Sequence, residues 1–166
     1  MAELWVNSPV DDVTVQVTLT EVRPDGYETL IQSGWLRLGH RAATEGANLR
    51  LTRTYSKEDY ERVPVGIWIP ASVTIPSVAH PMRAGSKLRI LVSTPGRDHG
   101  TWEFTPPAYE NESLPTFQLG YGPDYPTRLK MVVLPNIEIP DSYPPCPSLR
   151  GQPCREYRAV ENQQRP

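Results

Sequence analysis

The stretch that decides the fold is residues 13–26, which read VTVQVTLTEVRPDG. In its first half apolar residues alternate with polar ones, and this period of two is typical of a β-strand with one buried face. The Pro-Asp-Gly run at 24–26 supplies the dihedral angles of a tight turn. A second extended run follows through residues 30–38. The two runs and the turn between them predict a β-hairpin.

The rest of the chain continues the strand-like pattern. Apolar residues hold the odd positions from 63 to 75, which predicts one long strand, or two strands joined at Pro70. No segment shows a sustained 3.6-residue apolar period, and 19 prolines in 166 residues interrupt regular elements. We therefore expect an all-β protein, and specifically a jelly-roll β-sandwich. Its further strands are expected at 87–92, 101–104, 117–121 and 128–134.

The same alternation predicts which side chains form the core. Each expected core residue lies on the apolar face of a predicted strand, where the other face is polar or exposed. The nine residues expected to be buried are Val15, Val17, Leu19, Ile67, Ile69, Leu88, Ile90, Met131 and Val133.

The domain organisation is inferred from chain length and from the prolines. A chain of 166 residues suits one domain, and most of its prolines lie in the second half. We expect the sandwich to occupy residues 1–135, with an extended, proline-rich tail over 136–166 that packs on it or trails from it. Residues 2–6 already resemble a strand, which suggests that the chain is cut from a longer protein.

Composition argues against several classes of partner. A net charge of −2 and a pI of about 5.9 give no electrostatic case for a nucleic-acid partner. The apolar runs are shorter than the ~20 residues that a membrane span needs, so we expect no membrane partner. Glu3 and Asn7 interrupt any signal-peptide core. The location is left open between the cytoplasm and secretion, in a bacterium.

The sequence offers no catalytic, metal or cofactor motif. The nucleophile elbow of an α/β-hydrolase, G-x-S-x-G, is absent, and Gly85-Ser86 has the wrong spacing and opens a predicted strand. His40, His80 and His99 have no carboxylate or Cys at ligand spacing, so no metal site is expected. No Gly-rich phosphate loop indicates a cofactor. We therefore assign no catalytic, metal-binding or cofactor-binding residue.

Two sets of residues leave alternatives open. Cys146 and Cys154 flank seven residues, and either form a disulfide, worth about 2.5 kcal/mol in the chain-entropy model, or remain free thiols. The tryptophans either stack on sugar rings or pack in the core or against a neighbouring domain, and the apolar strand patterns around them favour packing. The four are Trp5, Trp35, Trp68 and Trp102.

Three segments, in this order, carry a resemblance to a known family. They are residues 13–41, with GWLR at 34–37 and HR at 40–41, residues 79–90, AHPMRAGSKLRI, and residues 149–154, LRGQPC. The chain resembles the C-terminal domain shared by X-Pro dipeptidyl-peptidases and cocaine-esterase-type acyl hydrolases. The resemblance implies a galactose-binding-like jelly roll that follows an α/β-hydrolase domain, which holds the catalytic Ser, Asp and His. Met82 and Ser86 depart from the family pattern, where an aromatic residue and a His are common.

The resemblance implies a non-catalytic domain that braces the hydrolase domain of its parent chain and shapes substrate access. Trp5 is a candidate contact with that partner. Arg37, Arg41 and Arg89 either bind carboxylates of the neighbouring domain or are solvated. The alternative function is a stand-alone carbohydrate-binding module of the same fold. Expressed alone, the domain is expected to expose an apolar patch and to self-associate, with Trp5, Pro107 and Tyr109 as members.

Overall fold

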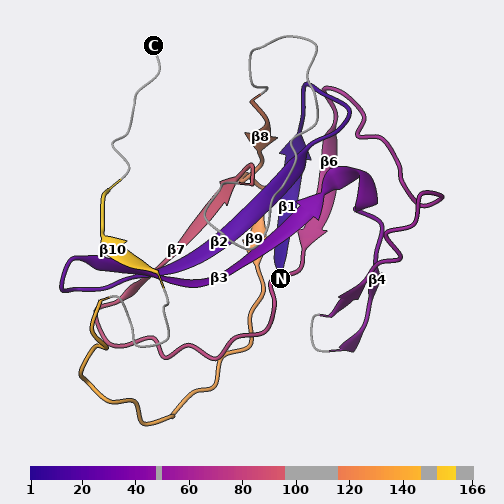
Figure 1. The fold of residues 1–166 in the computed structure, drawn as a ribbon. Coiled ribbons are helices and arrows are strands. Elements are labelled where there is room, and N and C mark those ends of the chain that lie inside the picture. The colour runs from indigo at the N-terminus through magenta and orange to yellow at the C-terminus, as the bar shows by residue number, and fades with distance from the viewer. Residues whose placement is uncertain (48–49, 96–115, 147–152, 160–166) are drawn as a thin grey trace.

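The computed structural model describes residues 1–47, 50–95, 116–146 and 153–159. Two antiparallel sheets form a β-sandwich, and a small two-stranded sheet lies beside them (Figure 1). The first sheet contains β6 (Trp68–Val73), β1 (Ala2–Asn7), β8 (Gln118–Leu119) and β9 (Arg128–Leu129). The second contains β10 (Cys154–Glu156), β3 (Tyr27–Arg37), β2 (Thr14–Val22) and β7 (Lys87–Ser93). The small sheet pairs β4 (Thr44–Glu45) with β5 (Leu51–Thr52), and the 3₁₀ helix η1 is Leu38–His40.

The predicted hairpin is confirmed as β2 and β3. Nine residues of β2 pair with β3, and the register shifts by one residue between Leu19 and Thr20. At the turn Gly26 has φ +87°, a left-handed conformation that glycine adopts without steric cost. The Gly26 amide donates to the Arg23 carbonyl at 3.2 Å, and the Arg23 amide donates to the Tyr27 carbonyl at 2.8 Å. These bonds close the turn and set the register of both strands.

The core lies between the two sheets, where alternate residues of each strand point inward. On β1 the inward residues are Ala2, Leu4 and Val6, each at most 2 % exposed. They meet Val15 and Val17 of β2, which are fully buried. Fully burying a side chain of this size stabilises a fold by about 1.5–3 kcal/mol. The remaining core residues are Val13, Leu19, Leu36, Leu38, Val63, Ile69, Ala71 and Val73.

Gly34 is needed for close packing against the chain after β6, and not for a bend in its own strand. Glycine in a strand often marks a bend or a bulge, but Gly34 pairs in register with Val17 and the irregularity lies elsewhere, after Leu19. A Cβ at Gly34 would lie 2.1 Å from the Thr74 carbonyl oxygen. The glycine therefore allows the chain that leaves β6 to approach β3 closely.

The predicted burial is wrong for five of the nine expected core residues. Val15, Val17, Leu19 and Ile69 are buried as expected. The other five are exposed by 37–69 %: Ile67, Leu88, Ile90, Met131 and Val133.

Each exposed residue has a local reason. Ile67 belongs to a turn, because Gly66 has φ +74° and the strand begins only at Trp68. Ile90 pairs with Leu19 and shares its face, but β7 is the edge strand of its sheet and lies at the rim of the sandwich. The expected strand at 128–134 is regular only over Arg128–Leu129, because its pairing with β1 stops there.

The tail contributes to the sandwich. Strand β10 pairs antiparallel with residues 27–29 of β3, and the Leu30 amide donates to the Pro153 carbonyl at 2.9 Å. The expected strand at 101–104 lies outside the described residues. No helix among the residues that the structure describes is long and apolar enough to span a membrane.

Candidate interaction site

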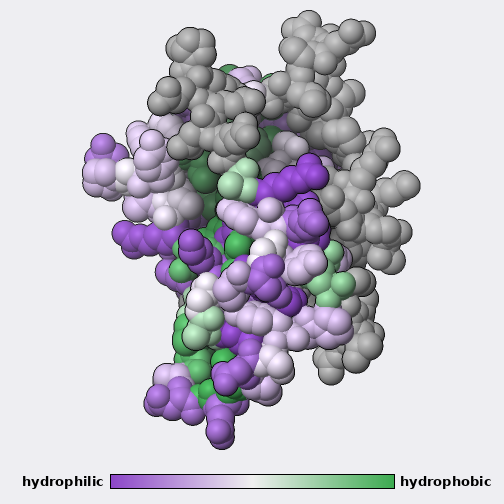
Figure 2. Space-filling model, turned by 90° about the vertical axis from the view of Figure 1, so that its left-hand side faces the viewer, coloured by the Kyte–Doolittle hydropathy of each residue, from purple (hydrophilic) through white to green (hydrophobic). Residues whose placement is uncertain are grey.

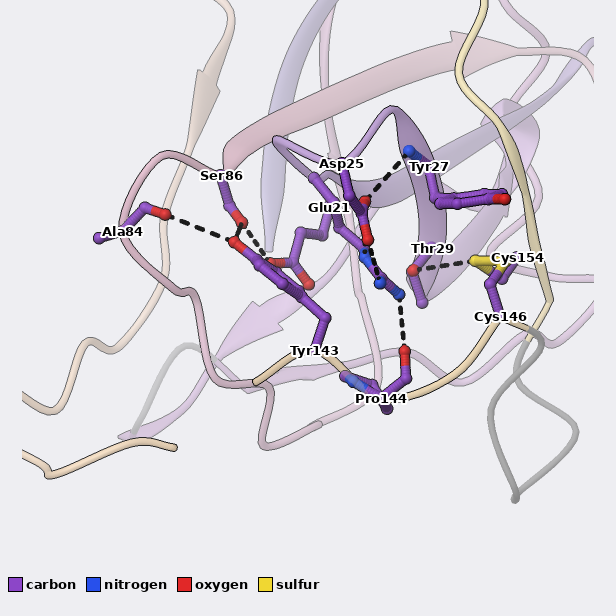
Figure 3. Close-up of polar contacts among 11 residues, drawn as sticks. Glu21, Asp25, Tyr27, Thr29, Ala84, Ser86, Tyr143, Pro144, Cys146 and Cys154 are labelled. Atoms are coloured by element: carbon purple, nitrogen blue, oxygen red, sulfur yellow. Dashed lines mark hydrogen bonds and ion pairs between the residues drawn. A yellow bond between two sulfur atoms is a disulfide. The ribbon is translucent and has the colours of Figure 1, made fainter. Parts of the chain in front are cut away.

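A buried carboxylate stands at the end of β2, beside the hairpin turn. The side chain of Glu21 is 3 % exposed. Its Oε1 accepts a hydrogen bond from the Ser86 hydroxyl at 2.6 Å, and its Oε2 lies 2.7 Å from His80 Nε2. Figure 3 shows the Ser86 hydroxyl in contact with both Glu21 and Tyr143. The hydrogen-bonded oxygens of Ser86 and Tyr143 are 2.9 Å apart.

Serine, histidine and a carboxylate here do not form a catalytic triad. In a triad the histidine lies between the other two, accepts the serine proton and is oriented by the carboxylate. Here Glu21 lies between Ser86 and His80, so the serine hydroxyl donates to the carboxylate, and among the described residues no histidine nitrogen is placed to accept its proton. The cluster instead fastens the loop between β6 and β7 to the end of β2.

The tail packs against the same turn through Tyr143. The Arg23 guanidinium lies 4.6 Å from the Tyr143 ring, donates to the Pro144 carbonyl at 3.0 Å and forms an ion pair with Asp25. Burial by itself raises the pKa of Asp25, but the hydrogen bonds from Arg23 and the Tyr27 amide outweigh it, so its pKa is lowered. Arg23 is only 7 % exposed, and it ties the tail to the hairpin turn.

A second buried carboxylate lies where β10 joins the sheet. Glu28 is 2 % exposed and accepts from the Thr20 hydroxyl at 2.7 Å, from Arg89 at 3.0 Å and from Arg155 at 3.2 Å. Burial raises the pKa of Glu28, but Thr20 and then the two guanidinium groups outweigh burial, and the net pKa is lowered. A surface depression of about 470 Å³ opens here, and its lining residues are Glu28, Arg89, Arg155, Glu156 and Arg158.

The arginines expected at a domain interface all have partners inside the chain. Arg37 pairs with Asp12, and this hydrogen bond is the main reason why the pKa of Arg37 is raised. Arg41 lies 2.7 Å from a Glu61 carboxylate oxygen and donates to its carbonyl at 2.8 Å. Arg89 holds Glu28, as described above. A role in binding a neighbouring domain stays a prediction for all three.

The tryptophans are divided between the two sheets. Trp68 of β6 stacks on Tyr125, with ring centroids 4.6 Å apart and planes at 20°, and Trp5 packs against the same ring at 5.4 Å. Trp35 is half-buried and donates to the Gln16 side chain at 2.9 Å. The aromatic faces of Trp5 and Trp68 are partly covered by Tyr125, so this arrangement does not favour a sugar-stacking platform. Trp102 lies outside the described residues.

The structure joins Cys146 and Cys154 in a disulfide, with their Cα atoms 5.4 Å apart. The bond links the tail to β10, and the Thr29 hydroxyl on β3 donates to Cys154 Sγ at 3.4 Å (Figure 3). Within the described ranges, no group of three or more His, Cys, Asp or Glu side chains is placed to hold a metal ion.

The exposed apolar side chains include residues of the edge strand β7 and of the chain after β9. Leu88 and Ile90 on β7 are 37 % and 47 % exposed. Figure 2 shows patches of hydrophobic surface between hydrophilic groups. One patch lies at the lower left edge of that view, at the level of the long loops below the sheets in Figure 1. The exposed apolar residues after β9 are Met131, Val132, Val133, Leu134 and Ile137. Pro107 and Tyr109, expected in this patch, lie outside the described residues.

Sequence reasoning missed both buried carboxylates. Glu21 and Glu28 flank the hairpin turn, and each is the only acidic residue of its strand. That placement was the available signal, because a charged side chain inside a two-sheet protein needs a partner. Their partners could not be inferred, since His80 and Arg155 lie 59 and 127 residues away along the chain.

A β-sandwich whose described charged clusters are engaged internally, and which leaves apolar side chains exposed, has features expected of an accessory domain. Residues 1–132 match the model of one family, the X-Pro dipeptidyl-peptidase C-terminal non-catalytic domain. The chain belongs to this family. No curated protein and no solved structure matches it. A non-catalytic domain of such an enzyme implies association with a catalytic domain in the parent.

Proposed function

We propose that this domain braces the α/β-hydrolase domain of a serine hydrolase, either an X-Pro dipeptidyl-peptidase or an acyl esterase, and shapes access of substrate to it. The observation that carries the proposal is the exposure of Leu88 and Ile90. Both lie on β7, and Ile90 pairs with the buried Leu19 on the face that forms the core. Apolar side chains on that face remain in solvent in this chain, and a neighbouring domain would cover them.

Exposed apolar side chains agree with this role. Interdomain interfaces within one chain commonly bury about 600–1,500 Å², whereas monomers rarely leave contiguous apolar patches of that size exposed. The described polar clusters do not favour a different function, because the Glu21 and Glu28 carboxylates are already bound by side chains of this same chain. A galactose-binding-like topology and a bacterial source remain part of this proposal.

Sedimentation of the isolated chain tests the exposed surface. We expect concentration-dependent self-association, and we expect the double substitution Leu88→Ser and Ile90→Ser to reduce it. The matched control is Tyr121→Ser, since Tyr121 is 91 % exposed and its loss should change little. A monomer at high concentration, unchanged by the double substitution, would count against the proposal.

The second test uses the parent hydrolase. There, Leu88→Ser with Ile90→Ser should lower the midpoint of thermal unfolding and change KM for a bulky substrate more than for a small p-nitrophenyl ester. Equal stability and equal KM values for both substrates would overturn the role in bracing and access.

A further inference from the structure

Residues 131–139, which we call the linker, follow β9 without taking part in either sheet. The last main-chain bond before them joins the Lys130 amide to the Met1 carbonyl at 2.9 Å, and the described structure gives the linker itself no hydrogen bond or ion pair. In Figure 1 this stretch descends from β9 and runs below the sheets before the chain returns to β10. Hydrogen bonds therefore fix the linker only at its two ends.

The linker turns at Asn136, whose φ of +61° is left-handed. Residues with a Cβ adopt this conformation at a cost in free energy, which is lower for Asn than for most others. The side chains from 131 to 138 are all exposed, so little packing offsets that cost. A linker that straightened would recover it.

The arm follows the linker, and we define it as residues 140–146 and 153–157. The disulfide between Cys146 and Cys154 joins its two parts, and β10 belongs to the second part. Both cysteines lie within the arm. The arm can therefore leave the sheet and dock again as one unit without any covalent change.

Side chains beside the hairpin turn hold the first part of the arm. Arg83 donates to the Pro140 carbonyl at 2.8 Å, and its guanidinium lies 5.1 Å from the Tyr143 ring. The hydroxyl oxygens of Tyr143 and Ser86 are hydrogen-bonded (Figure 3). Arg23 holds the same part of the arm, as described above. These contacts involve no linker residue.

The sheet itself holds the second part of the arm. Strand β10 pairs antiparallel with residues 27–29 of β3, and the Tyr157 amide donates to the Gly26 carbonyl at 2.8 Å. Arg155 donates to the buried Glu28 carboxylate at 3.2 Å. All of these partners lie on the hairpin, and a second copy of the chain offers the same partners in the same geometry.

We propose that the arm exchanges between two copies of this chain, so that each arm docks on β3 and on the hairpin turn of the other copy. The exchanged dimer keeps every docking contact of the monomer, and only the linker changes its conformation. The balance between the two states then depends on the linker and on protein concentration. In a two-fold dimer the straightened linkers pass close to the axis, where their exposed apolar side chains can cover one another. This inference does not rest on the bracing role.

A cysteine pair across β3 and β10 reports which copy an arm occupies. Tyr27 and Glu156 are directly opposed, and the next position, Gly26 with Tyr157, is hydrogen-bonded. Tyr27 and Glu156 therefore form a non-hydrogen-bonded pair, whose Cα atoms lie about 4.5 Å apart, within the range for a disulfide. One copy carries Tyr27→Cys, and a second copy with a longer affinity tag carries Glu156→Cys. The two are mixed at high concentration, oxidised and separated on a non-reducing gel.

Docking of the tagged copy's arm on the other copy should give a covalent heterodimer. The control mixture pairs Glu156→Cys with Tyr121→Cys, because Tyr121 is 91 % exposed and reports random collisions. We expect the first mixture to yield at least about ten times more heterodimer than the control, since docking raises the local concentration of the two thiols. Equal yields from the two mixtures would overturn the proposal.

Two variants of the linker test the exchange without added cysteines. Asn136→Gly adopts the left-handed turn without steric cost, whereas Asn136→Ala disfavours it. Sedimentation should give a dimer association constant at least about fivefold higher for Asn136→Ala than for Asn136→Gly. Both chains also carry Leu88→Ser and Ile90→Ser, which removes association through β7, so the result is separate from a failure of the bracing role. Equal constants, or the reverse order, would rule out arm exchange.

Discussion

Glu28 shows how a single buried carboxylate can hold two distant parts of the chain. Thr20 belongs to β2 and Arg89 to the edge strand β7, whereas Arg155 belongs to the tail, and all three donate to the same side chain. Hydrogen bonds to a charged group are stronger than neutral ones, and loss of one partner leaves the others unsatisfied. Glu28 therefore couples the attachment of β10 to the integrity of the hairpin.

Replacement of Glu28 by Gln should lower the free energy of unfolding by about 2 kcal/mol at pH 7, because two guanidinium groups lose their carboxylate. The control is Glu156→Gln on the exposed rim of the same depression, which should change stability by less than about 0.5 kcal/mol. Urea unfolding monitored by fluorescence measures both. A loss in the control as large as that in Glu28→Gln would argue against a specific role.

The lowered pKa of Glu28 also predicts a pH dependence. A carboxylate whose pKa is lower in the folded state contributes stability that is complete above its unfolded-state pKa and is lost as the pH falls through its folded-state pKa. The ordinary pKa of Glu is about 4.3, so the loss should occur on acidification from about pH 5 downward. The difference in stability between the wild type and Glu28→Gln should shrink over that range. A difference independent of pH would contradict this.

Gly34 offers a purely steric test at the scale of one atom. A methyl group there would lie 2.1 Å from the Thr74 carbonyl oxygen, which is part of the backbone and not easily displaced. We expect Gly34→Ala to cost about 3 kcal/mol, at the upper end for overpacking. Gly122→Ala is the control, because a Cβ there meets nothing within 4 Å. Equal unfolding midpoints for the two variants would show that β3 and the chain after β6 can move apart.

At the scale of elements, the local hairpin was predicted correctly from the sequence, whereas burial and pairing that depend on distant elements were not. The β2–β3 hairpin followed from the turn residues at 24–26 and the alternation around them. The face of β7 was also correct, because Ile90 lies with Leu19. The burial of Ile90 was not predicted correctly. Burial depends on which elements pack against that face of the strand, and those elements are distant in sequence.

Strand β10 could not be found from the sequence pattern. It has three residues, Cys-Arg-Glu, without apolar alternation, and it lies in a proline-rich tail. Its position depends on contacts made elsewhere: the disulfide to Cys146, the pairing with β3 and the ion pair of Arg155 with Glu28. The candidate site was missed for the same reason, because Glu21 meets His80 and Ser86 only after the sheets assemble.

The disulfide should stabilise β10 against the sheet. Replacing both Cys146 and Cys154 by Ser should lower the free energy of unfolding by about 2.5 kcal/mol, from the entropy of the closed loop. Amide exchange at residues 27–29 of β3 should speed up in the variant, whereas exchange in β6 should not. Wild-type protein reduced with dithiothreitol should behave as the variant does. Uniform acceleration in both sheets would show that the bond acts on the whole fold instead.

At the scale of the whole molecule, the chain should lack hydrolase activity. The described residues place Ser86 on Glu21 and not on a histidine, and the sequence has no nucleophile elbow. We expect no turnover of a p-nitrophenyl ester or of an X-Pro anilide by the purified chain. Turnover that disappears with Ser86→Ala would show that the Glu21 cluster is catalytic after all.

The pairing of β1 with β9 has a consequence for synthesis on the ribosome. Lys130 follows Met1 by 129 residues, and chains grow by about 5–20 residues per second. The first strand therefore exists for roughly 6–26 s before this partner has been made. The β2–β3 hairpin, by contrast, can close in microseconds once its residues are free, because its strands are joined by a short turn. Assembly should begin at the hairpin, and the first strand made in this chain should be among the last to be completed.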